Sequence, residues 1–429
     1  MPRTGGSDTA VASRPSSFAP LRHRQYRLVW TGSLVSNVGT WMQAAALGYY
    51  TAHLTKSAGW SAVVAAGEFA PTALLGPFGG AIADRFARRT VFLTSTLVQA
   101  VLAVALTWGM VVGQPGAPVL ALFALANGCV FALGFPAYAA ILPELVPKEE
   151  IGAAVGLSSA AWNLGRIAGP LAGTLLYQQA GIAWVLGVNA VSFLAVVAVL
   201  LTLRVPDQAR STGPMLAAIR EGFAFVRAQP GLRVTAQALC LNALFVAPFI
   251  GLIPAMVEKE LGGGKRAVGW LITGQGIGAV ITGFVFGRLS ETFGVRRVMV
   301  ASLVGGPVAL VAYGLSPSWP WAFVAIIGCG ACYFAALSSF STVANLLAPS
   351  DLRGRVLSLN QVILGTVYAI SLNIEGQLGD RIGLREVTVG GALASLVVLL
   401  AVRLVRPGST AVLDPADEAI VASPDPSPA

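Results

Sequence analysis

The sequence predicts an all-α integral membrane protein whose twelve transmembrane helices form two pseudo-symmetric six-helix bundles. Three observations predict this fold: an apolar composition, twelve long apolar stretches and an internal repeat. Of the 429 residues, 55% are hydrophobic and only 11% are charged, whereas an ordinary soluble domain has about 25% charged residues. This composition excludes a disordered protein, a disulfide-bonded scaffold and a conventional cytosolic enzyme.

The chain begins with a polar, basic segment, residues 1–27, that contains no apolar core. We therefore expect a cytoplasmic N-terminal flank and not a cleaved signal peptide. A helix needs roughly 20 apolar residues to cross the hydrocarbon core of a bilayer. The twelve stretches of that kind are 28–51, 60–82, 91–112, 118–141, 153–177, 182–202, 235–257, 268–288, 298–315, 321–345, 355–377 and 386–404.

Residues 203–234 are the longest connection and separate a first bundle (28–202) from a second (235–405). Apolar residues of this linker recur at helical spacing opposite charged ones, which predicts an amphipathic helix along the cytoplasmic membrane surface. The apolar face is Met215, Leu216, Ile219, Phe223 and Val226, and the charged face is Arg220, Glu221 and Arg227. Residues 406–429 are rich in Pro, Ser and Asp, which predicts a disordered cytoplasmic tail.

The basic residues predict the orientation, because short cytoplasmic loops carry an excess of Lys and Arg. With a cytoplasmic N-terminus, that side of the membrane receives 21 of the 28 basic residues and the other side receives six. The remaining one, Arg166, lies inside a span. We therefore expect a multi-pass protein of the plasma (inner) membrane with both termini in the cytoplasm.

Two short segments, each directly after the second span of its bundle, repeat one pattern. Residues 80–89 read GAIADRFARR, and residues 287–296, 207 positions later, read GRLSETFGVR. The matching pairs include Gly80 with Gly287, Asp84 with Glu291 and Arg89 with Arg296. Six spans separate the two copies, so both lie on the same side of the membrane. Related halves of this kind are typical of transporters.

Residues 80–89 resemble the signature loop between helices 2 and 3 of the major facilitator superfamily, although Ala87 stands where glycine is usual. Residues 165–173, GRIAGPLAG, resemble the helix-5 motif of proton-coupled exporters. Together with DLRGR at 351–355, this motif makes the chain similar to the enterobactin-exporter-like, drug-efflux branch. The resemblance implies the major facilitator fold and transport by alternating access.

The resemblance also implies that the two repeated segments form a cytoplasmic gate, which holds the outward-facing state. The expected gate residues are Gly80, Asp84, Arg85, Arg88, Arg89, Gly287, Glu291 and Arg296. In the alternative interpretation, the charges of these segments only set the topology.

The exporter motif consists of Gly165, Gly169, Pro170 and Gly173. Its three glycines recur every four residues, so they form one smooth helix face on which another helix can pack closely. Pro170 can bend the span. The motif would form either a leak-proof interface between the two bundles or an ordinary contact between small residues.

Glu68 and Arg166 are the two charged residues closest to the predicted midplane. By helical rise, each lies within roughly 5 Å of the centre of the bilayer. A charge at that depth is unfavourable unless it faces a partner or a watery cavity, so a functional role is the first hypothesis. We expect Glu68 to exchange protons, and a nearby guanidinium would oppose its protonation. The alternative is a structural ion pair between the second and fifth spans.

In the family fold, the first, fourth, seventh and tenth helices line a central cavity. The resemblance therefore points to polar and aromatic residues of these spans as substrate contacts, in a wall suited to a hydrophobic compound. These residues are Asn37, Trp41, Gln43, Phe131, Tyr138, Asn242, Phe245, Tyr333 and Phe334. Each is also compatible with ordinary packing.

The function predicted from the sequence is secondary active transport, with proton-coupled export of a small, partly hydrophobic compound such as a drug or siderophore. An importer, a lipid flippase or a channel is the alternative. No Walker A loop is present, and both histidines lie outside the spans without a metal-ligand cluster. We therefore expect no enzyme activity, metal, cofactor or nucleic-acid partner, and a monomer in the lipid bilayer that uses the proton gradient.

Overall fold

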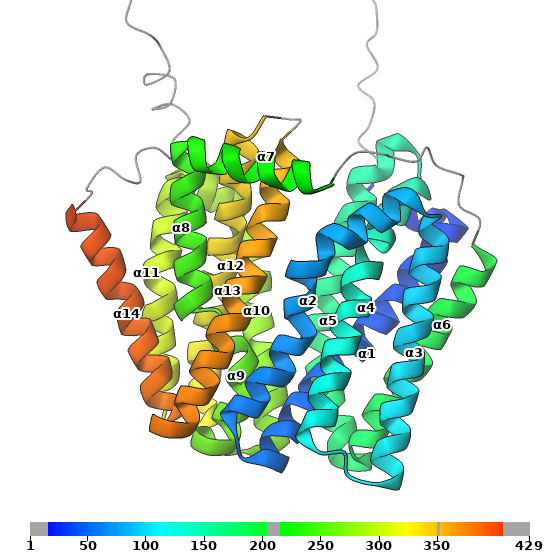
Figure 1. The fold of residues 1–429 in the computed structure, drawn as a ribbon, viewed down its shortest axis with the longest axis horizontal. Coiled ribbons are helices and arrows are strands. Elements are labelled where there is room, and N and C mark those ends of the chain that lie inside the picture. Colours follow the sequence, from blue (N-terminus) through cyan, green and yellow to red (C-terminus); the bar gives the residue numbers. More distant parts are fainter. Residues whose placement is uncertain (1–15, 204–214, 350–351, 406–429) are drawn as a thin grey trace, which may run out of the picture.

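A computed structural model describes residues 16–203, 215–349 and 352–405. The predictions for residues 1–15, for residues 204–214 of the linker, for Asp351 and for the tail from 406 lie outside the described residues. All regular secondary structure in these described ranges is helical, and they contain no strand (Figure 1). The predicted all-α membrane fold is therefore confirmed.

The described helices follow the order of the predicted spans and extend most of them by several residues. The N-terminal bundle comprises α1 (Arg24–Thr55), α2 (Ala58–Arg85), α3 (Arg88–Val112), α4 (Ala117–Glu144), α5 (Ile151–Ala180) and α6 (Ile182–Thr202), with short turns η1 (Ala19–Arg22) and η2 (Lys148–Glu150). The C-terminal bundle comprises α8 (Pro230–Phe245), α9 (Phe249–Met256), η3 (Val257–Leu261), α10 (Gly264–Phe293), α11 (Val295–Gly314), α12 (Trp319–Leu347), α13 (Arg353–Ile382) and α14 (Leu384–Val405).

The seventh predicted span consists of three consecutive helical segments, α8, α9 and η3. The helix breaks at Val246–Pro248, where the amides of Val246 and Ala247 both donate to the carbonyl of Asn242. Pro248 has no amide hydrogen to continue the ladder. The combined segment Pro230–Leu261 still has the length and apolarity of a membrane span.

Among the described helices, ten segments are long and apolar enough to cross a membrane by length and composition. The two further predicted spans, α1 and α5, have 32 and 30 residues. They are more polar, because α1 contains Asn37 and Gln43 and α5 contains Asn163 and Arg166. Polar residues in a span usually face the protein interior or a cavity and mark functional sites, so these two helices are candidates to carry one.

The predicted linker helix is present as α7 (Met215–Ala228) and lies across one end of the C-terminal bundle (Figure 1). Val226 is buried against Leu232 and Ala348, whereas Phe223 is exposed. The side chains of Met215, Leu216, Ile219 and Arg220 lie outside the described part. We call the end of the molecule that carries α7 the α7 face, and the opposite end the far face.

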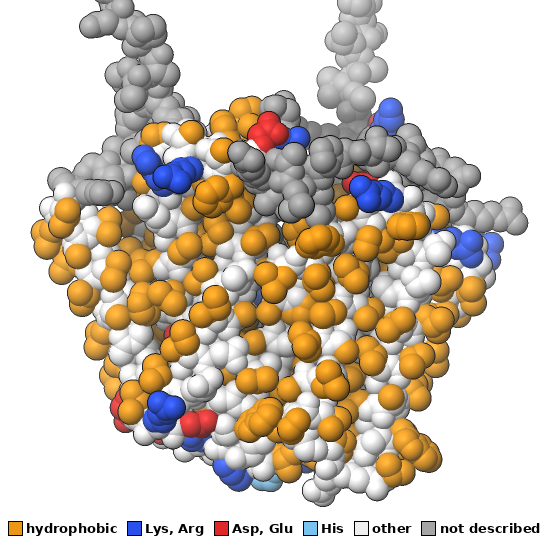
Figure 2. Space-filling model, viewed as in Figure 1, with side chains coloured by type: hydrophobic (Ala, Val, Ile, Leu, Met, Phe, Trp, Pro, Cys, Tyr) orange, Lys and Arg blue, Asp and Glu red, His pale blue; other side chains and the backbone are white. Residues whose placement is uncertain are grey.

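The surface matches a bilayer environment. In Figure 2 hydrophobic side chains cover the middle of the molecule, and Lys and Arg lie towards its two ends. Large apolar side chains such as Trp108, Phe284 and Leu404 are each more than 65% exposed. A soluble protein rarely presents so much continuous apolar surface, whereas lipid tails can cover it.

The two bundles pack against each other from the far face to about mid-height. Gly376 of α13 lies against Ala58 and Ala62 of α2, and Gly365 lies against Ala73. These contacts extend over about 22 Å of α2, at 1.5 Å per residue. Nearer the α7 face, a side chain added at Gly80 would meet no atom within 4 Å. The bundles therefore touch at the far half of α2 and separate towards the α7 face.

A second line of contact joins α5 to α10. A Cβ atom built on Gly269 would lie 2.2 Å from Thr174 Oγ1, so only glycine permits this approach. The hydroxyl of Thr273 donates to the carbonyl of Ile167 at 3.1 Å. Small residues let helices approach closely in a membrane, where packing and hydrogen bonds drive association.

Candidate functional site

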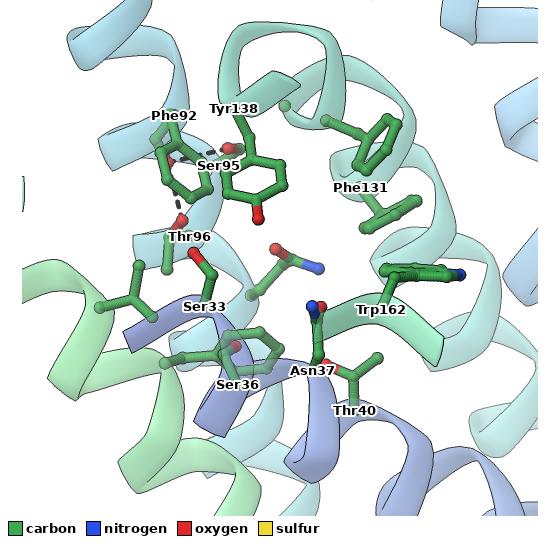
Figure 3. A pocket seen from close by; sticks show the side chains of 15 residues that line it. Ser33, Ser36, Asn37, Thr40, Phe92, Ser95, Thr96, Phe131, Tyr138 and Trp162 are labelled. Atoms are coloured by element: carbon green, nitrogen blue, oxygen red, sulfur yellow. Dashed lines mark hydrogen bonds between the residues drawn. The ribbon is translucent and has the colours of Figure 1, made fainter. Parts of the chain in front are cut away.

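A small pocket lies inside the N-terminal bundle beside the interface with the other bundle. One wall carries hydroxyl and amide groups from α1 and α3, and the other carries aromatic rings from α4 and α5 (Figure 3). The labelled lining residues are Ser33, Ser36, Asn37, Thr40, Phe92, Ser95, Thr96, Phe131, Tyr138 and Trp162. With a volume of about 60 Å³, the pocket accommodates one group of a ligand rather than a whole drug-sized molecule.

Two hydroxyl groups in this pocket have unused hydrogen-bonding capacity. Ser33 Oγ and Tyr138 Oη are buried and lie near each other, and among the described residues neither has a hydrogen-bond partner of normal geometry. Buried polar groups are nearly always satisfied in folded proteins. The pocket therefore presents polar groups that a ligand or ordered water can satisfy, next to rings suited to an apolar or aromatic group.

A chain of aromatic rings leads from this pocket to the other bundle. Trp162 and Trp41 pack edge to face with centroids 5.9 Å apart, and Trp41 lies 6.4 Å from Phe69. Phe69 meets Tyr368 of α13 at 6.5 Å, again edge to face. The indole nitrogen of Trp41 is buried without a hydrogen-bond partner. The pocket is therefore continuous with an apolar, aromatic contact between the bundles.

Glu68 and Arg166 both lie at this interface, but they do not pair with each other. Glu68 on α2 interacts electrostatically with Tyr368 of α13, and Arg166 on α5 interacts with Tyr333 of α12. Two guanidinium nitrogens of Arg166, Nε and Nη2, are buried without a hydrogen-bond partner. The described chain contains no ion pair of either residue, so the structure does not support a fixed pair between the second and fifth spans.

At the α7 face, the contacts that the expected gate residues of the first copy make with the described residues lie within their own bundle. Arg88 pairs with Glu144 of α4 and lies 3.9 Å from Asp84 Oδ1. Arg89 donates to the carbonyls of Leu200 and Leu201 at the end of α6, at 2.7 and 2.8 Å. Arg85, Asp84 and Glu291 are exposed, and Gly80 and Gly287 face open space.

At the far face, Asp380 at the end of α13 holds the start of α2 across the interface. Its carboxylate accepts hydrogen bonds from the hydroxyl of Ser57 (2.6 Å) and the amides of Ala58 (2.7 Å) and Gly59 (2.9 Å). Lys259 adds an ion pair at 2.9 Å. A carboxylate is favoured at a helix N-terminus, where unpaired amides and the helix dipole attract negative charge. We call these five residues the far-face clasp.

Two more contacts close the far face beside the clasp. Lys56 of the N-terminal bundle pairs with Glu258 of η3, and His53 lies 3.2 Å from the same carboxylate. Lys265 donates to the carbonyl of Tyr177 at 3.1 Å and lies 4.2 Å from the centre of its ring. This arrangement combines an ion pair with a cation–π contact. The bundles are thus joined by several charged contacts at the far face.

A comparison with known families agrees with this architecture. A family model described as transmembrane secretion effector, one of the major facilitator families, matches residues 15–423. The chain belongs to this family. Among curated relatives, this secretion effector family member is 26% identical over 304 residues to the enterobactin exporter EntS of Escherichia coli O1:K1 and of Shigella boydii serotype 18. The match covers 70% of this chain and 72% of the relative.

Solved structures of transporters share the fold of this secretion effector family member. The nucleoside transporter NupG matches with a TM-score of 0.72 at 13% identity, covering 88% of this chain and 98% of that one. A bacterial homologue of the human lysosomal transporter Spinster, solved in an inward-facing and unoccupied conformation, matches with a TM-score of 0.67 at 15% identity. It covers 94% of this chain and 99% of the other. At these identities the likeness concerns the fold alone.

Not every residue expected to line the cavity of this family member lies there. Gln43 accepts a hydrogen bond from Asn189 of α6 at 3.0 Å, so it is buried inside the N-terminal bundle. Phe245 lines a groove on the outer side of the C-terminal bundle. These two assignments were wrong, because the side on which a residue lies depends on how its helix is rotated, and an apolar sequence does not specify this rotation.

The other cavity residues of the C-terminal bundle differ in position. Tyr333 interacts with Arg166 across the interface and packs edge to face on Phe249 with centroids 6.5 Å apart. Phe334 lies 3.7 Å from the position of a Cβ on Gly283, so it packs between α12 and α10. Asn242 is buried, and its amide nitrogen has no hydrogen-bond partner in the part of the chain that the structure describes. Of these three, Tyr333 is the one that faces the other bundle.

The exporter motif of this family member packs α5 against α1 of the same bundle. A Cβ on Gly169 would lie 2.5 Å from Trp41 Cβ, and one on Gly173 would lie 2.9 Å from Met42 Cα. A Cβ on Gly165 would lie 3.0 Å from Asn37 Cβ. The prediction that the motif forms an interface between the two bundles was therefore wrong for its three glycines. Their neighbour Pro170 does face the other bundle, since its carbonyl lies 3.1 Å from the Cβ position of Gly269.

This packing makes Gly169→Val an expected destabilising substitution. The new side chain would overlap Trp41, and overpacking a tight contact costs about 1–3 kcal/mol. We expect a clearly lower melting temperature for the purified protein in detergent. Gly156→Val on the same helix is the matched control, because that glycine has open space around it. An equal loss of melting temperature in both variants would contradict the tight α1–α5 contact.

The far-face clasp was not among the predicted sites, although the sequence contains a signal for it. Residues 376–385 read GQLGDRIGLR, and they match GAIADRFARR at 80–89 in Gly376, Asp380, Arg381 and Arg385. The two segments end α13 and α2, which run antiparallel, so they lie at opposite faces. An odd number of spans separates this copy from the first, so it does not share a side of the membrane with the other two copies.

Proposed function

We propose that this protein is a secondary active exporter that works by alternating access, and that it couples export of a small, partly hydrophobic compound to proton entry. The family and its enterobactin-exporter relatives support outward transport. The excess of basic residues at the α7 face supports a cytoplasmic position for that face, and hence cytoplasmic termini. On this basis the far face is the outer one, in the inner membrane. The proposal takes the chain as a monomer, with one transport path between its two bundles.

One observation carries the proposal. The bundles are joined at the far face by the clasp and its neighbouring ion pairs, whereas among the described residues Asp84, Arg88 and Arg89 bind within their own bundle. This is the arrangement expected for an inward-facing state, in which the polar and aromatic pocket is reached from the cytoplasm. The antiparallel copies of the glycine–aspartate–arginine segment supply one latch for each face, and alternating access requires two alternative latches.

The proposed substrate follows from the chemistry of the pocket and interface. Unsatisfied hydroxyls of Ser33 and Tyr138 suit polar substituents, and the rings of Phe131, Trp162 and Trp41 suit an aromatic or apolar body. Arg166, with two unsatisfied guanidinium nitrogens, suits an acidic group. A siderophore or an amphipathic drug combines these features.

Transport in proteoliposomes with an imposed pH gradient tests the function. Purified protein is reconstituted, and uptake of siderophores and lipophilic drugs is compared with and without a proton gradient of each sign. We expect accumulation driven by the opposing proton gradient. Flux indifferent to the gradient would support facilitated diffusion or a channel, and movement of labelled phospholipid alone would support a flippase.

A second test concerns the latch at the α7 face. Asp84→Asn is expected to reduce transport at least tenfold in protein that inserts normally. By analogy with Asp380, the charged form of Asp84 would hold the start of α13 when the α7 face closes, and a neutral amide holds a helix N-terminus less strongly. Glu149→Gln is the control, because this acid is also exposed at the α7 face outside the repeated segments. An unchanged rate for Asp84→Asn would contradict the latch.

A further inference from the structure

A large groove lies on the outer side of the C-terminal bundle, away from the interface between the bundles. It has a volume of about 1480 Å³ and is bounded mainly by α8, α11 and α14. In Figure 1 the end of α14 nearest the α7 face diverges from the rest of the bundle. Because the wall is formed by residues such as Leu241, Val304, Leu399 and Leu400, it is apolar along most of its length.

The charges of the groove are all positive and lie at one end. Arg296 and Arg297 stand in the first turn of α11, and Arg403 stands in the last turn of α14. Both helix ends belong to the α7 face. Among the described residues that line the groove, none is acidic. The first turn of a helix already has a positive potential from the helix dipole, so two arginines there strengthen the attraction for an anion.

The length of the groove corresponds to one leaflet of a bilayer. Its lining residues on α8 run from Val234 to Phe245, which is about 16 Å at 1.5 Å per residue. The hydrocarbon core of a bilayer is about 30 Å thick, so one leaflet contributes about 15 Å. Acyl chains entering from the α7 face would fill the groove to its end and leave a head group at the level of the arginines.

We propose that this groove is a specific site for an anionic phospholipid. The acyl chains lie between α8 and α14, and the phosphate is held by Arg297 and Arg403, with Arg296 beside them. Guanidinium groups bind phosphate through paired hydrogen bonds, and basic pockets between transmembrane helices on the cytoplasmic side select anionic head groups. The acyl chains of a zwitterionic lipid would fit the same apolar groove. Its head group also carries a positive charge, however, which the arginines would repel.

Lipid binding to delipidated protein tests the site and does not require transport activity. Protein in a neutral detergent is titrated with phosphatidylglycerol or phosphatidylcholine of the same chain length, and bound lipid is counted by native mass spectrometry. We expect at least a tenfold preference for phosphatidylglycerol. The variant Arg297→Gln with Arg403→Gln should lose this preference. The control Arg288→Gln with Lys148→Gln removes two exposed charges from the same face outside the groove and should keep it.

Two further arms separate a lipid site from a simple anion site. Ala401→Trp narrows the groove without changing a charge, and it should weaken phosphatidylglycerol binding at least fivefold. Inorganic phosphate at millimolar concentration should not displace the lipid. Equal binding of both lipids to the unaltered protein, an unchanged preference in the arginine variant, or full competition by phosphate would each overturn the proposal. All these substitutions are at the protein surface, so a single sharp peak in size-exclusion chromatography verifies that the variants are folded.

Discussion

Asp380→Asn is expected to shift the protein towards a conformation that is open at the far face. The substitution removes the negative charge that holds Ser57, the amides of Ala58 and Gly59, and Lys259. Hydrogen bonds to charged groups contribute about 1.5–3 kcal/mol, and 1.4 kcal/mol changes an equilibrium tenfold. The ratio of molecules with a closed far face to molecules with an open far face should therefore fall at least tenfold.

Distances between spin labels measure this shift in a background without the four native cysteines. Labels at Gln179 and Pro317 report on the far face, and labels at Lys148 and Arg288 report on the α7 face. We expect the first distance to lengthen and the second to shorten in Asp380→Asn. Asp84→Asn is the reciprocal control and should keep the far face closed. Unchanged distances in Asp380→Asn would refute the role of the clasp.

Glu68→Gln is expected to abolish proton-driven accumulation of substrate. Movement of substrate down its own concentration gradient should remain. Glu68 carries a carboxylate near the middle of its span, within electrostatic reach of Tyr368 on the other bundle and without an ion-pair partner in the described chain. Rearrangement of the bundles changes its surroundings, so a group in this position can take up and release a proton once per cycle. Glutamine has nearly the same shape and carries no titratable proton.

The matched control for this prediction is Glu375→Gln. Glu375 also lies inside a helix of the membrane region, but its carboxylate is near Ser371 and Gly391 within the C-terminal bundle. Proton flux and substrate flux are measured together in the same proteoliposomes. Loss of coupling in Glu68→Gln but not in Glu375→Gln supports the assignment. Retained coupling in Glu68→Gln would exclude this residue as the essential proton carrier.

The two bundles differ in how well the sequence predicted their functional residues. Asn37, Phe131 and Tyr138 were expected together in a cavity, and they line one pocket in the structure. Their helices belong to one bundle and contain polar groups whose burial restricts helix rotation. In the C-terminal bundle Phe245 was misplaced, because the helix breaks at Val246–Pro248, directly after this residue, and the break changes the direction of the chain.

Several features follow from the sequence by itself. Length and apolarity determine the spans, since each crossing must satisfy its backbone inside a helix. An even number of spans places both ends of the chain on one side, and the distribution of Lys and Arg predicts that this side is cytoplasmic. The Gly–Asp–Arg segments could be recognised without any coordinates.

Only the tertiary structure decided which residues meet. It packed the glycines of the exporter motif against α1, separated Glu68 from Arg166, and brought Asp380 to the start of α2. The physical reason is that lipid is as apolar as most side chains of a span, so no hydrophobic stripe orients a membrane helix about its axis. Close packing of small residues and a few hydrogen bonds between helices far apart in the sequence determine that orientation.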